Sequence, residues 1–266
     1  MRSPDEDLKH PKISACVITF NEEANIRRCL SSLTWCDEIV VVDSFSTDRT
    51  PEICKEFTDR FYQHKWQGYI AQRNYNRKQA RYPWVLFLDA DEEVSPDLRN
   101  EILEEFKDRG PGHLGYEFPR QVYYLGRWIR FGSWYPDYKL RLFLKEKGSI
   151  GGMEPHDQVH VRGPVGRMKN PIWHYTYTDI TDHINTMNRF SAISAQAMYD
   201  RGRRFSWIDF LFRPPWRFFK GFCLRSGWLD GRRGFIISMI NAFGVTAKYA
   251  KLWEIQRAER DTAEER

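Results

Sequence analysis

The sequence contains no apolar stretch long enough to cross a membrane as a helix. Its longest uncharged, apolar-rich run covers only residues 234–247, whereas a transmembrane helix needs roughly 18–20 such residues. Cysteine is scarce, with five residues, an odd number, and no CxxC pair. The first ten residues carry five charges and no apolar run, so we expect no signal peptide. These absences predict a cytoplasmic protein with reduced thiols.

Familiar phosphate-binding loops are also missing. No Gly-Lys dipeptide occurs, which excludes a Walker-type loop. Residues 110–115 match GxGxxG, but they follow a predicted helix and precede a predicted strand, the reverse of a dinucleotide fingerprint. Internal repeats and low-complexity linkers are absent as well. With 41% hydrophobic and 29% charged residues, the 266-residue chain has the composition of a globular protein that buries a core.

The first 110 residues alternate between apolar runs and helical periodicity. Helices are predicted between and after the strands, and this order predicts an α/β domain with a mostly parallel sheet and right-handed crossovers. After residue 114, short strands rich in Tyr, Trp, Arg and Gly follow, and a helix over about 180–201 ends this part. The predicted early strands are 13–20, 38–43, 60–64 and 84–89. The predicted early helices are about 26–33, one with Pro51 in its first turn, about 68–80 and 96–107.

Polar side chains stand at the ends of the clear predicted strands. Asn21 and Glu22 follow the first, Asp43 ends the second, and Asp89 and Asp91 end the last. Because ligands bind beyond the carboxyl ends of parallel strands, we expect these groups to share one edge. Their repulsion calls for a divalent cation or for the donors of a nucleotide. The spacing of Asp89 and Asp91 fits a cation bound to diphosphate; alternatively, Asp91 caps a turn and Asp89 only ends a strand.

Three motifs in order carry a family resemblance. They are VITFNE at 17–22, VVDSFSTD at 41–48 and FLDAD at 87–91. Together they resemble the inverting family 2 glycosyltransferases, which have the GT-A fold. The likeness continues through His156-Asp157 and residues 172–177 and covers about 13–253. This longer pattern resembles the β-1,4-glucosyltransferase branch that acts on the lipopolysaccharide inner core.

The resemblance implies a donor site built from five residues, to which Asp89 of the FLDAD motif contributes. Asp43 would contact the uracil or ribose of the nucleotide, with Asn21 and Glu22 beside it. Arg73 falls where the family places a basic side chain near the donor. The alternative for Arg73 is a solvated helix face that carries further basic residues at 77, 78 and 81.

The resemblance also implies a metal site for Mg²⁺ or Mn²⁺. Asp89 and Asp91 would form the metal-binding pair, with Asp91 as the direct ligand. His174 would be a further ligand, because neutral imidazole commonly binds metals. The alternative for His174 is a packed, hydrogen-bonded core histidine.

Inverting transfer needs a base that removes the proton of the acceptor hydroxyl. The segment 153–157 offers two carboxylates, Asp157 and Glu154. The related branch has His-Glu where this chain has His156-Asp157, so Asp157 would be the base at the matching position and Glu154 the alternative. A purely structural role for the segment is the third reading.

Acceptor contacts are predicted at Trp134, Tyr138 and Arg141, because sugar faces stack on aromatic rings. The alternative is that these three residues pack the second half of the domain.

The last third of the chain combines basic and aromatic residues. Residues 201–233 carry nine basic and two acidic side chains, a net charge of +7, and nine aromatics. Phe, Leu and Ile mixed with Trp favour an anionic bilayer surface over nucleic acid. In residues 234–253, one helical face is apolar and the opposite one polar; packing on the catalytic domain, or a homo-oligomer interface, is the alternative. The apolar face comprises Phe235, Ile236, Met239, Ile240, Phe243 and Ala247, and the polar face Asn241, Lys248 and Lys251.

The sequence thus predicts an N-terminal arm (1–12), a GT-A catalytic domain (13–202) and an amphipathic helical appendage at the membrane interface (203–266). The catalytic domain would divide into a nucleotide-sugar half (13–110) and an acceptor half (111–202). The predicted function is metal-dependent inverting transfer of a sugar, glucose by the resemblance, from a UDP-sugar to a lipid-linked saccharide at the inner face of the cytoplasmic membrane. The rivals are a sugar nucleotidyltransferase and a non-catalytic nucleotide-sugar-binding membrane adaptor.

Overall fold

The computed structural model describes residues 11–107, 110–153 and 156–264, which form two compact units. The first unit contains the described residues up to Gln121 and Asp137–Tyr175, and the second contains Val122–Pro136 and the described residues from Thr176 onward. Strand β6 (Gly115–Tyr124) begins in the first unit and ends in the second. Among the described candidate site residues, only Trp134 belongs to the second unit.

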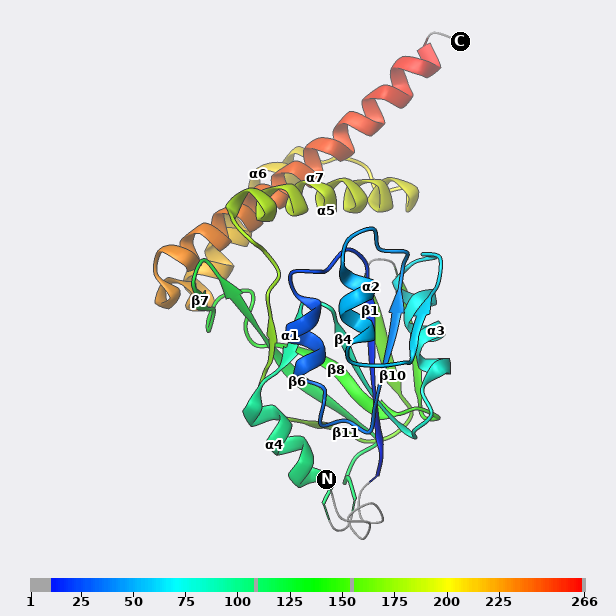
Figure 1. The fold of residues 1–266 in the computed structure, drawn as a ribbon. Helices are drawn as coiled ribbons and strands as arrows, with labels where there is room; N and C mark the ends of the chain where they lie inside the picture. Colours follow the sequence, from blue (N-terminus) through cyan, green and yellow to red (C-terminus); the bar gives the residue numbers. More distant parts are fainter. Residues whose placement is uncertain (1–10, 108–109, 154–155, 265–266) are drawn as a thin grey trace. The chain divides into compact units, whose positions relative to one another are not determined.

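A mixed β-sheet with helices on both faces forms the first unit (Figure 1). The predicted early strands are present as β1 (Ile13–Thr19), β2 (Glu38–Asp43), β3 (Phe61–Gln63) and β4 (Trp84–Asp89). The helices between and after them are α1 (Ile26–Ser31), α2 (Thr50–Lys55), α3 (Tyr69–Gln79) and α4 (Pro96–Glu105). The remaining strands of this unit are β5 (Glu92–Val94), β8 (Asp137–Leu144), β9 (Gly148–Met153), β10 (His156–Val161), β11 (Val165–Arg167) and β12 (Ile172–His174).

The strand order is β3-β2-β1-β4-β8-β6-β12-β5, with β11 beside β6. Strands β3, β2, β1 and β4 run parallel, as predicted, and β8 joins β4 in antiparallel orientation. Strands β9 and β10 form a separate antiparallel hairpin. The parallel strands therefore deliver their carboxyl ends to one edge, where the predicted polar residues stand.

Alternating side chains of the parallel strands fill two cores. In β4, Trp84, Leu86 and Leu88 face the core that α1, α2 and α4 cover. Val85 and Phe87 face the opposite core, against which α3 packs through Ile70. This period of two explains why continuous apolar runs form these strands, since both faces of the sheet are buried.

The second unit is mainly helical. A two-residue turn at Leu125 and Gly126, both with positive φ, joins the end of β6 to β7 (Arg127–Trp128). Helices α5 and α6 pack on α7, drawn in Figure 1 as the long helix that ends in red. Within the described residues, no helix is both long and apolar enough to span a bilayer. The helical elements are α5 (Ile180–Asp200), α6 (Trp207–Phe219), the π-helical turn η2 (Lys220–Leu224), the 3₁₀ turn η3 (Gly227–Asp230) and α7 (Arg232–Glu264).

Helix α7 differs from the amphipathic face predicted for residues 234–253. Phe235 and Met239 are exposed as expected, but Ile240 is 8% exposed and packs inward. The predicted polar face is also partly covered, because Asn241 is buried and Lys251 donates hydrogen bonds to Asn188 on α5. The face prediction was wrong at these positions, since α5 supplies polar partners that the periodicity of one helix does not reveal.

Candidate active site

The register of the parallel strands brings the predicted polar residues to one edge of the sheet. Thr19 of β1 lies opposite Asp43 of β2, and Ile18 lies opposite Asp89 of β4. Asp43 and Asp89 therefore flank the end of β1, where Asn21 follows. The edge that the sequence predicted is present in the first unit.

Asp43 lies at the base of this edge and is fully buried. Its carboxylate accepts hydrogen bonds from the backbone N–H of Ser46, at 2.9 Å, and from the Ser46 hydroxyl. Gln63, the last residue of β3, donates to it at 3.2 Å. These contacts hold the carboxylate in one orientation, so it can act as a fixed acceptor for donors of a ligand. Ser46 and Gln63 were not predicted from the sequence as partners of Asp43.

Asn21 and Glu22 connect the end of β1 to the loop after β2. Asn21 has a φ of 53° and accepts a hydrogen bond from the Thr47 backbone N–H at 2.8 Å. The Glu22 backbone N–H donates to the Thr50 hydroxyl at 2.8 Å. Asn21 thus braces the loop that holds Asp43, which is a positioning role beside the expected donor contact.

The Glu22 carboxylate lies in an acidic environment. Burial raises its pKa, and the nearby carboxylates of Asp91 and Asp89 raise it further, while a hydrogen bond from Asn25 at 2.9 Å lowers it. Glu22 therefore lies close enough to the Asp89-Ala90-Asp91 segment for their charges to repel. A cation bound at this edge would relieve that repulsion.

Asp89 is held between two arginines. Arg73 of α3 lies 2.5 Å from Oδ1, and Arg141 of β8 lies 2.6 Å from Oδ2. Burial raises the pKa of Asp89, but Arg141 and Arg73 outweigh burial and hold that pKa well below its usual value. Both carboxylate oxygens are thus neutralised by guanidinium groups.

Arg141 occupies a different environment from the acceptor cleft that the sequence predicted. It is 7% exposed, and besides Asp89 it contacts Glu92, whose own exposure is 1%, at 2.8 Å. Arg120 lies 3.6 Å from Glu92 and 2.7 Å from Asp137. Arg141 therefore belongs to a buried charge network. Its further members, Glu92 and Arg120, carried no signal of this role in the sequence.

Asp91 pairs with His174. The Nε2 atom of His174 lies 3.0 Å from Oδ2 of Asp91, and the two side chains are 10% and 24% exposed. Two backbone contacts align them, because His174 of β12 lies opposite Glu92 of β5 and the Tyr175 N–H donates to the Asp91 carbonyl at 2.9 Å. The structure thus brings together two predicted metal ligands that are 83 positions apart.

The Asp91–His174 pair fits a divalent cation of the Mg²⁺ or Mn²⁺ type. No group of three or more His, Cys, Asp or Glu side chains gathers as a metal site in the described part of the chain. Mg²⁺ in phosphate-transfer sites usually takes one or two carboxylates and completes its shell with phosphate oxygens and waters. One carboxylate and one imidazole leave room for those ligands, and Glu22 adds negative charge nearby.

The predicted base lies largely outside the described residues. Glu154 is not described at all. Asp157 is placed by its backbone in β10, opposite Gly152 of β9, but its side chain lies outside the described part. The role of either residue stays a prediction.

The two aromatic acceptor candidates lie in different units. Tyr138 of β8 is 38% exposed, and the Arg167 guanidinium stands 4.7 Å from its ring centre. Trp134 packs in the second unit, where its ring lies 5.3 Å from Tyr124, 5.7 Å from Tyr177 and 5.2 Å from His183. The packing alternative therefore describes the surroundings of Trp134, whereas Tyr138 is exposed and has the Arg167 guanidinium over its ring.

Comparison with known proteins defines the class of the chain. Residues 14–201, more than two thirds of its length, match the family described as Glycosyl transferase family 2. The chain belongs to this family and is a glycosyltransferase. The expected α/β fold of the GT-A type and the expected enzyme class, a glycosyltransferase, are thereby confirmed. The two rival functions, a nucleotidyltransferase and a non-catalytic adaptor, are not supported.

Two relatives match nearly the whole chain. The lipopolysaccharide core biosynthesis glycosyltransferase LpsC of Rhizobium meliloti is 29% identical over 249 residues, which cover 91% of this chain and 92% of LpsC. The uncharacterized glycosyltransferase RT0209 of Rickettsia typhi is 31% identical over 262 residues, which cover 94% and 89%. Among solved structures, S. aureus TarS 1–349 in complex with UDP-GlcNAc aligns with a TM-score of 0.46 and 16% identity, over 90% of this chain and 92% of that chain.

Proposed function

We propose that this glycosyltransferase transfers a sugar, glucose by the family resemblance, from a UDP-sugar to a lipid-linked saccharide of the lipopolysaccharide inner-core type. The observation that carries the proposal is the sheet edge where Asp43 ends β2 and Asp89 ends β4, with the Asp91–His174 pair directly after β4. The saccharide class rests on the likeness to LpsC over 91% of the chain.

Two parts of this edge bind different groups of the donor, the nucleoside and the diphosphate. Asp43, held by Ser46 and Gln63, accepts hydrogen bonds from the uracil or ribose. Asp91 and His174 would hold Mg²⁺ or Mn²⁺ at the diphosphate side of this edge. When bound, the ion neutralises the charge that grows on the departing diphosphate.

Asp89 takes a positioning role in this proposal. Its oxygens are engaged by Arg73 and Arg141, so it anchors the segment that carries Asp91 instead of binding the cation itself. Arg73 acts near the donor through this anchor. Both assignments modify the metal pair and the donor contact that the sequence suggested.

Asp157 is the proposed base. It removes the proton of the acceptor hydroxyl as that oxygen attacks the anomeric carbon, which gives inversion in a single displacement. Glu154 is the alternative within the same segment. Tyr138 offers its exposed ring to a sugar face of the acceptor.

The proposed site of action is an anionic membrane surface at the inner face of the cytoplasmic membrane. Helix α6 presents six of its large apolar side chains to solvent, and residues 201–233 around it have a net charge of +7. Exposed apolar groups beside basic ones favour binding at the headgroup boundary. Alternatively, the same face forms a homo-oligomer interface. The exposed residues of α6 are Trp207, Ile208, Leu211, Phe212, Trp216 and Phe219, with exposures from 44% to 71%.

A donor screen tests the function. The purified protein is incubated with UDP-glucose or other UDP-sugars, a lipopolysaccharide core acceptor, and Mg²⁺, Mn²⁺ or chelator, and UDP release is measured. We expect release that requires metal and acceptor and is fastest with UDP-glucose. Equal release in chelator would refute metal dependence, and an absence of transfer with every UDP-sugar would refute the donor class.

A further inference from the structure

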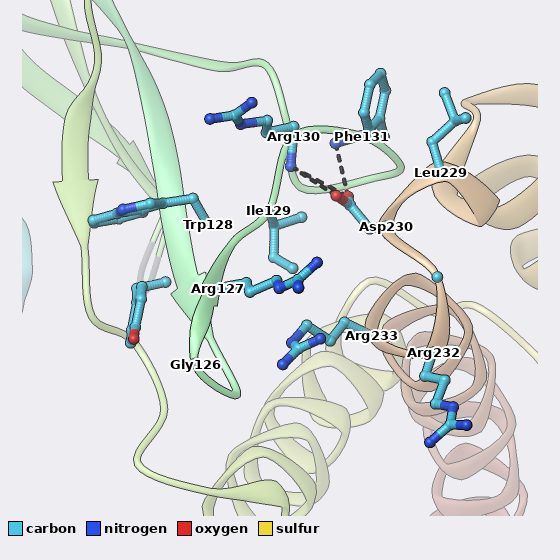
Figure 2. A pocket seen from close by; sticks show the side chains of 12 residues that line it. Gly126, Arg127, Trp128, Ile129, Arg130, Phe131, Leu229, Asp230, Arg232 and Arg233 are labelled. Atoms are coloured by element: carbon cyan, nitrogen blue, oxygen red, sulfur yellow. Dashed lines mark hydrogen bonds between the residues drawn. The ribbon is translucent and has the colours of Figure 1, made fainter.

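A basic cavity in the second unit contains none of the residues assigned above to catalysis or to the donor. Its volume is about 730 Å³, and it lies between the β6–β7 turn and the start of α7 (Figure 2). Three aromatic residues and Leu229 contribute apolar surface to it. Four arginines line it, Arg127, Arg130, Arg232 and Arg233.

Two of these arginines converge. Figure 2 shows Arg127 extending toward α7 and Arg233 extending back toward the turn, while Arg130 and Arg232 point elsewhere. The Arg233 Nε atom donates to the Leu125 carbonyl at 2.8 Å, which fixes the guanidinium beside the turn. Among the described residues, neither Arg127 nor Arg233 forms an ion pair with a carboxylate.

The one carboxylate that lines the cavity already has hydrogen-bond partners within the protein. Asp230 accepts hydrogen bonds from the backbone N–H groups of Arg130, at 3.2 Å, and Phe131, at 2.9 Å. These bonds tie the end of η3 to the loop after β7. The cavity lining therefore carries four positive charges against a single negative one, and two of the positive charges face each other. An anion that binds between them would relieve their mutual repulsion.

The surroundings of the cavity indicate what carries the anion. Leu229 is 48% exposed and Phe131 37% exposed at the cavity, and Trp228 and Phe235 next to its lining in sequence are 56% and 47% exposed. A small soluble anion would gain nothing from this apolar surface, whereas a lipid headgroup brings its phosphate and its apolar boundary together.

We propose that this cavity binds the phosphate group of a membrane lipid or glycolipid, with Arg127 and Arg233 as the phosphate ligands. Guanidinium groups suit this role because they bind phosphate oxygens in a bidentate manner. The inference rests on the membrane association proposed above and makes it specific, since a diffuse basic surface would not distinguish one headgroup phosphate from another.

The test compares two double variants with the same loss of charge. R127Q/R233Q removes the converging pair, and R130Q/R232Q removes the other two arginines that line the cavity. Binding of the full chain is measured by co-sedimentation with phosphatidylcholine vesicles that contain phosphatidic acid or phosphatidylserine at matched surface charge. No donor or acceptor is present, so the result does not depend on transfer.

We expect the wild-type protein to prefer phosphatidic acid, whose phosphate is a monoester. R127Q/R233Q should weaken that binding by about tenfold or more, since each hydrogen-bonded charge pair to a phosphate is worth a factor of this order, while R130Q/R232Q should change it far less. The single variant R127Q, which removes no side-chain hydrogen bond seen among the described residues, should show part of the same loss. Its circular dichroism spectrum and melting temperature should match those of the wild type.

Three results would overturn the proposal. Equal weakening by both double variants would indicate diffuse electrostatics. Saturable binding of inorganic phosphate in calorimetry without vesicles, lost in R127Q/R233Q, would assign the cavity to a soluble phosphate. Failure of the wild-type protein to bind any anionic vesicle would remove the membrane association itself, whereas metal-dependent UDP release would still report separately on the proposed transfer.

Discussion

The charge network around Asp89 predicts that Arg141 is needed chiefly for stability. Arg141→Met removes the guanidinium and keeps a long side chain. In the structure this guanidinium lies 2.6 Å from Asp89 and 2.8 Å from Glu92, with 8% side-chain exposure. Removing one partner of a buried ion pair costs about 3–5 kcal/mol. Because Arg73 still neutralises Asp89, we expect Arg141→Met to lower the free energy of unfolding by about 3 kcal/mol, the lower end of that range.

The stability lost in Arg141→Met should depend on pH. Burial raises the pKa of Asp89, but Arg141 and Arg73 outweigh burial and hold the pKa well below the usual value. In the wild-type protein this stabilisation is fully present above the unfolded-state pKa of about 3.9 and is lost as the pH falls through the folded-state pKa. Without Arg141 the folded-state pKa of Asp89 rises. The difference in free energy of unfolding between variant and wild type should therefore be largest at neutral pH and shrink below about pH 4.

Urea unfolding of both proteins at several pH values measures this difference. Arg120→Met is the matched control, because that side chain is 23% exposed and lies 3.6 Å from Glu92. We expect it to cost about 1 kcal/mol. An unchanged free energy of unfolding for Arg141→Met, combined with a raised KM for the acceptor, would refute the network and return Arg141 to the acceptor cleft.

Three further predictions concern the donor, the base and the membrane. Asp43→Ala should weaken UDP binding in calorimetry both with and without metal, because its contact is to the nucleoside. Asp157→Asn should lower kcat by something on the order of 10²–10⁴ with little change in donor affinity, and Glu154→Gln should be milder; a reversed order would move the base to Glu154. Phe212→Asp should reduce sedimentation with anionic vesicles, whereas Val165→Asp, at an exposed site in the first unit, should not.

The parallel half of the fold could be predicted from the sequence because its signals are local. In β4, both alternating faces are apolar, since one packs on α1, α2 and α4 and the other on α3. A run such as Trp84–Asp89 therefore reads as a buried strand without any knowledge of its neighbours. The shared position of the strand ends can then also be predicted, because parallel strands place Asp43 and Asp89 at the same edge.

The charge network could not be predicted because its members are distant in sequence. Arg141 lies 52 positions from Asp89, and only the pairing of β8 with β4 brings them together. A lone arginine in a strand rich in aromatics fits an acceptor cleft equally well. The Asp91–His174 pair was accessible only through the family resemblance, since the strand pairing that aligns it has no local signal.

The faces of α7 show the same limit. The periodicity of one helix separates apolar from polar positions, but it does not say which face has a partner. Lys251 contacts Asn188 and Ser191 of α5, and Ile240 packs inward. Partner helices decided these positions, so only part of the predicted apolar face is left exposed.

The central claim is that Asp91 and His174 hold the cation that binds the diphosphate. Calorimetric titration of UDP into the wild-type protein, with Mn²⁺ and then with chelator, tests it most directly when repeated on Asp91→Asn. We expect Mn²⁺ to strengthen UDP binding by the wild-type protein, and we expect this gain to disappear in Asp91→Asn while metal-free binding stays the same. A variant that keeps the full Mn²⁺-dependent gain would contradict it.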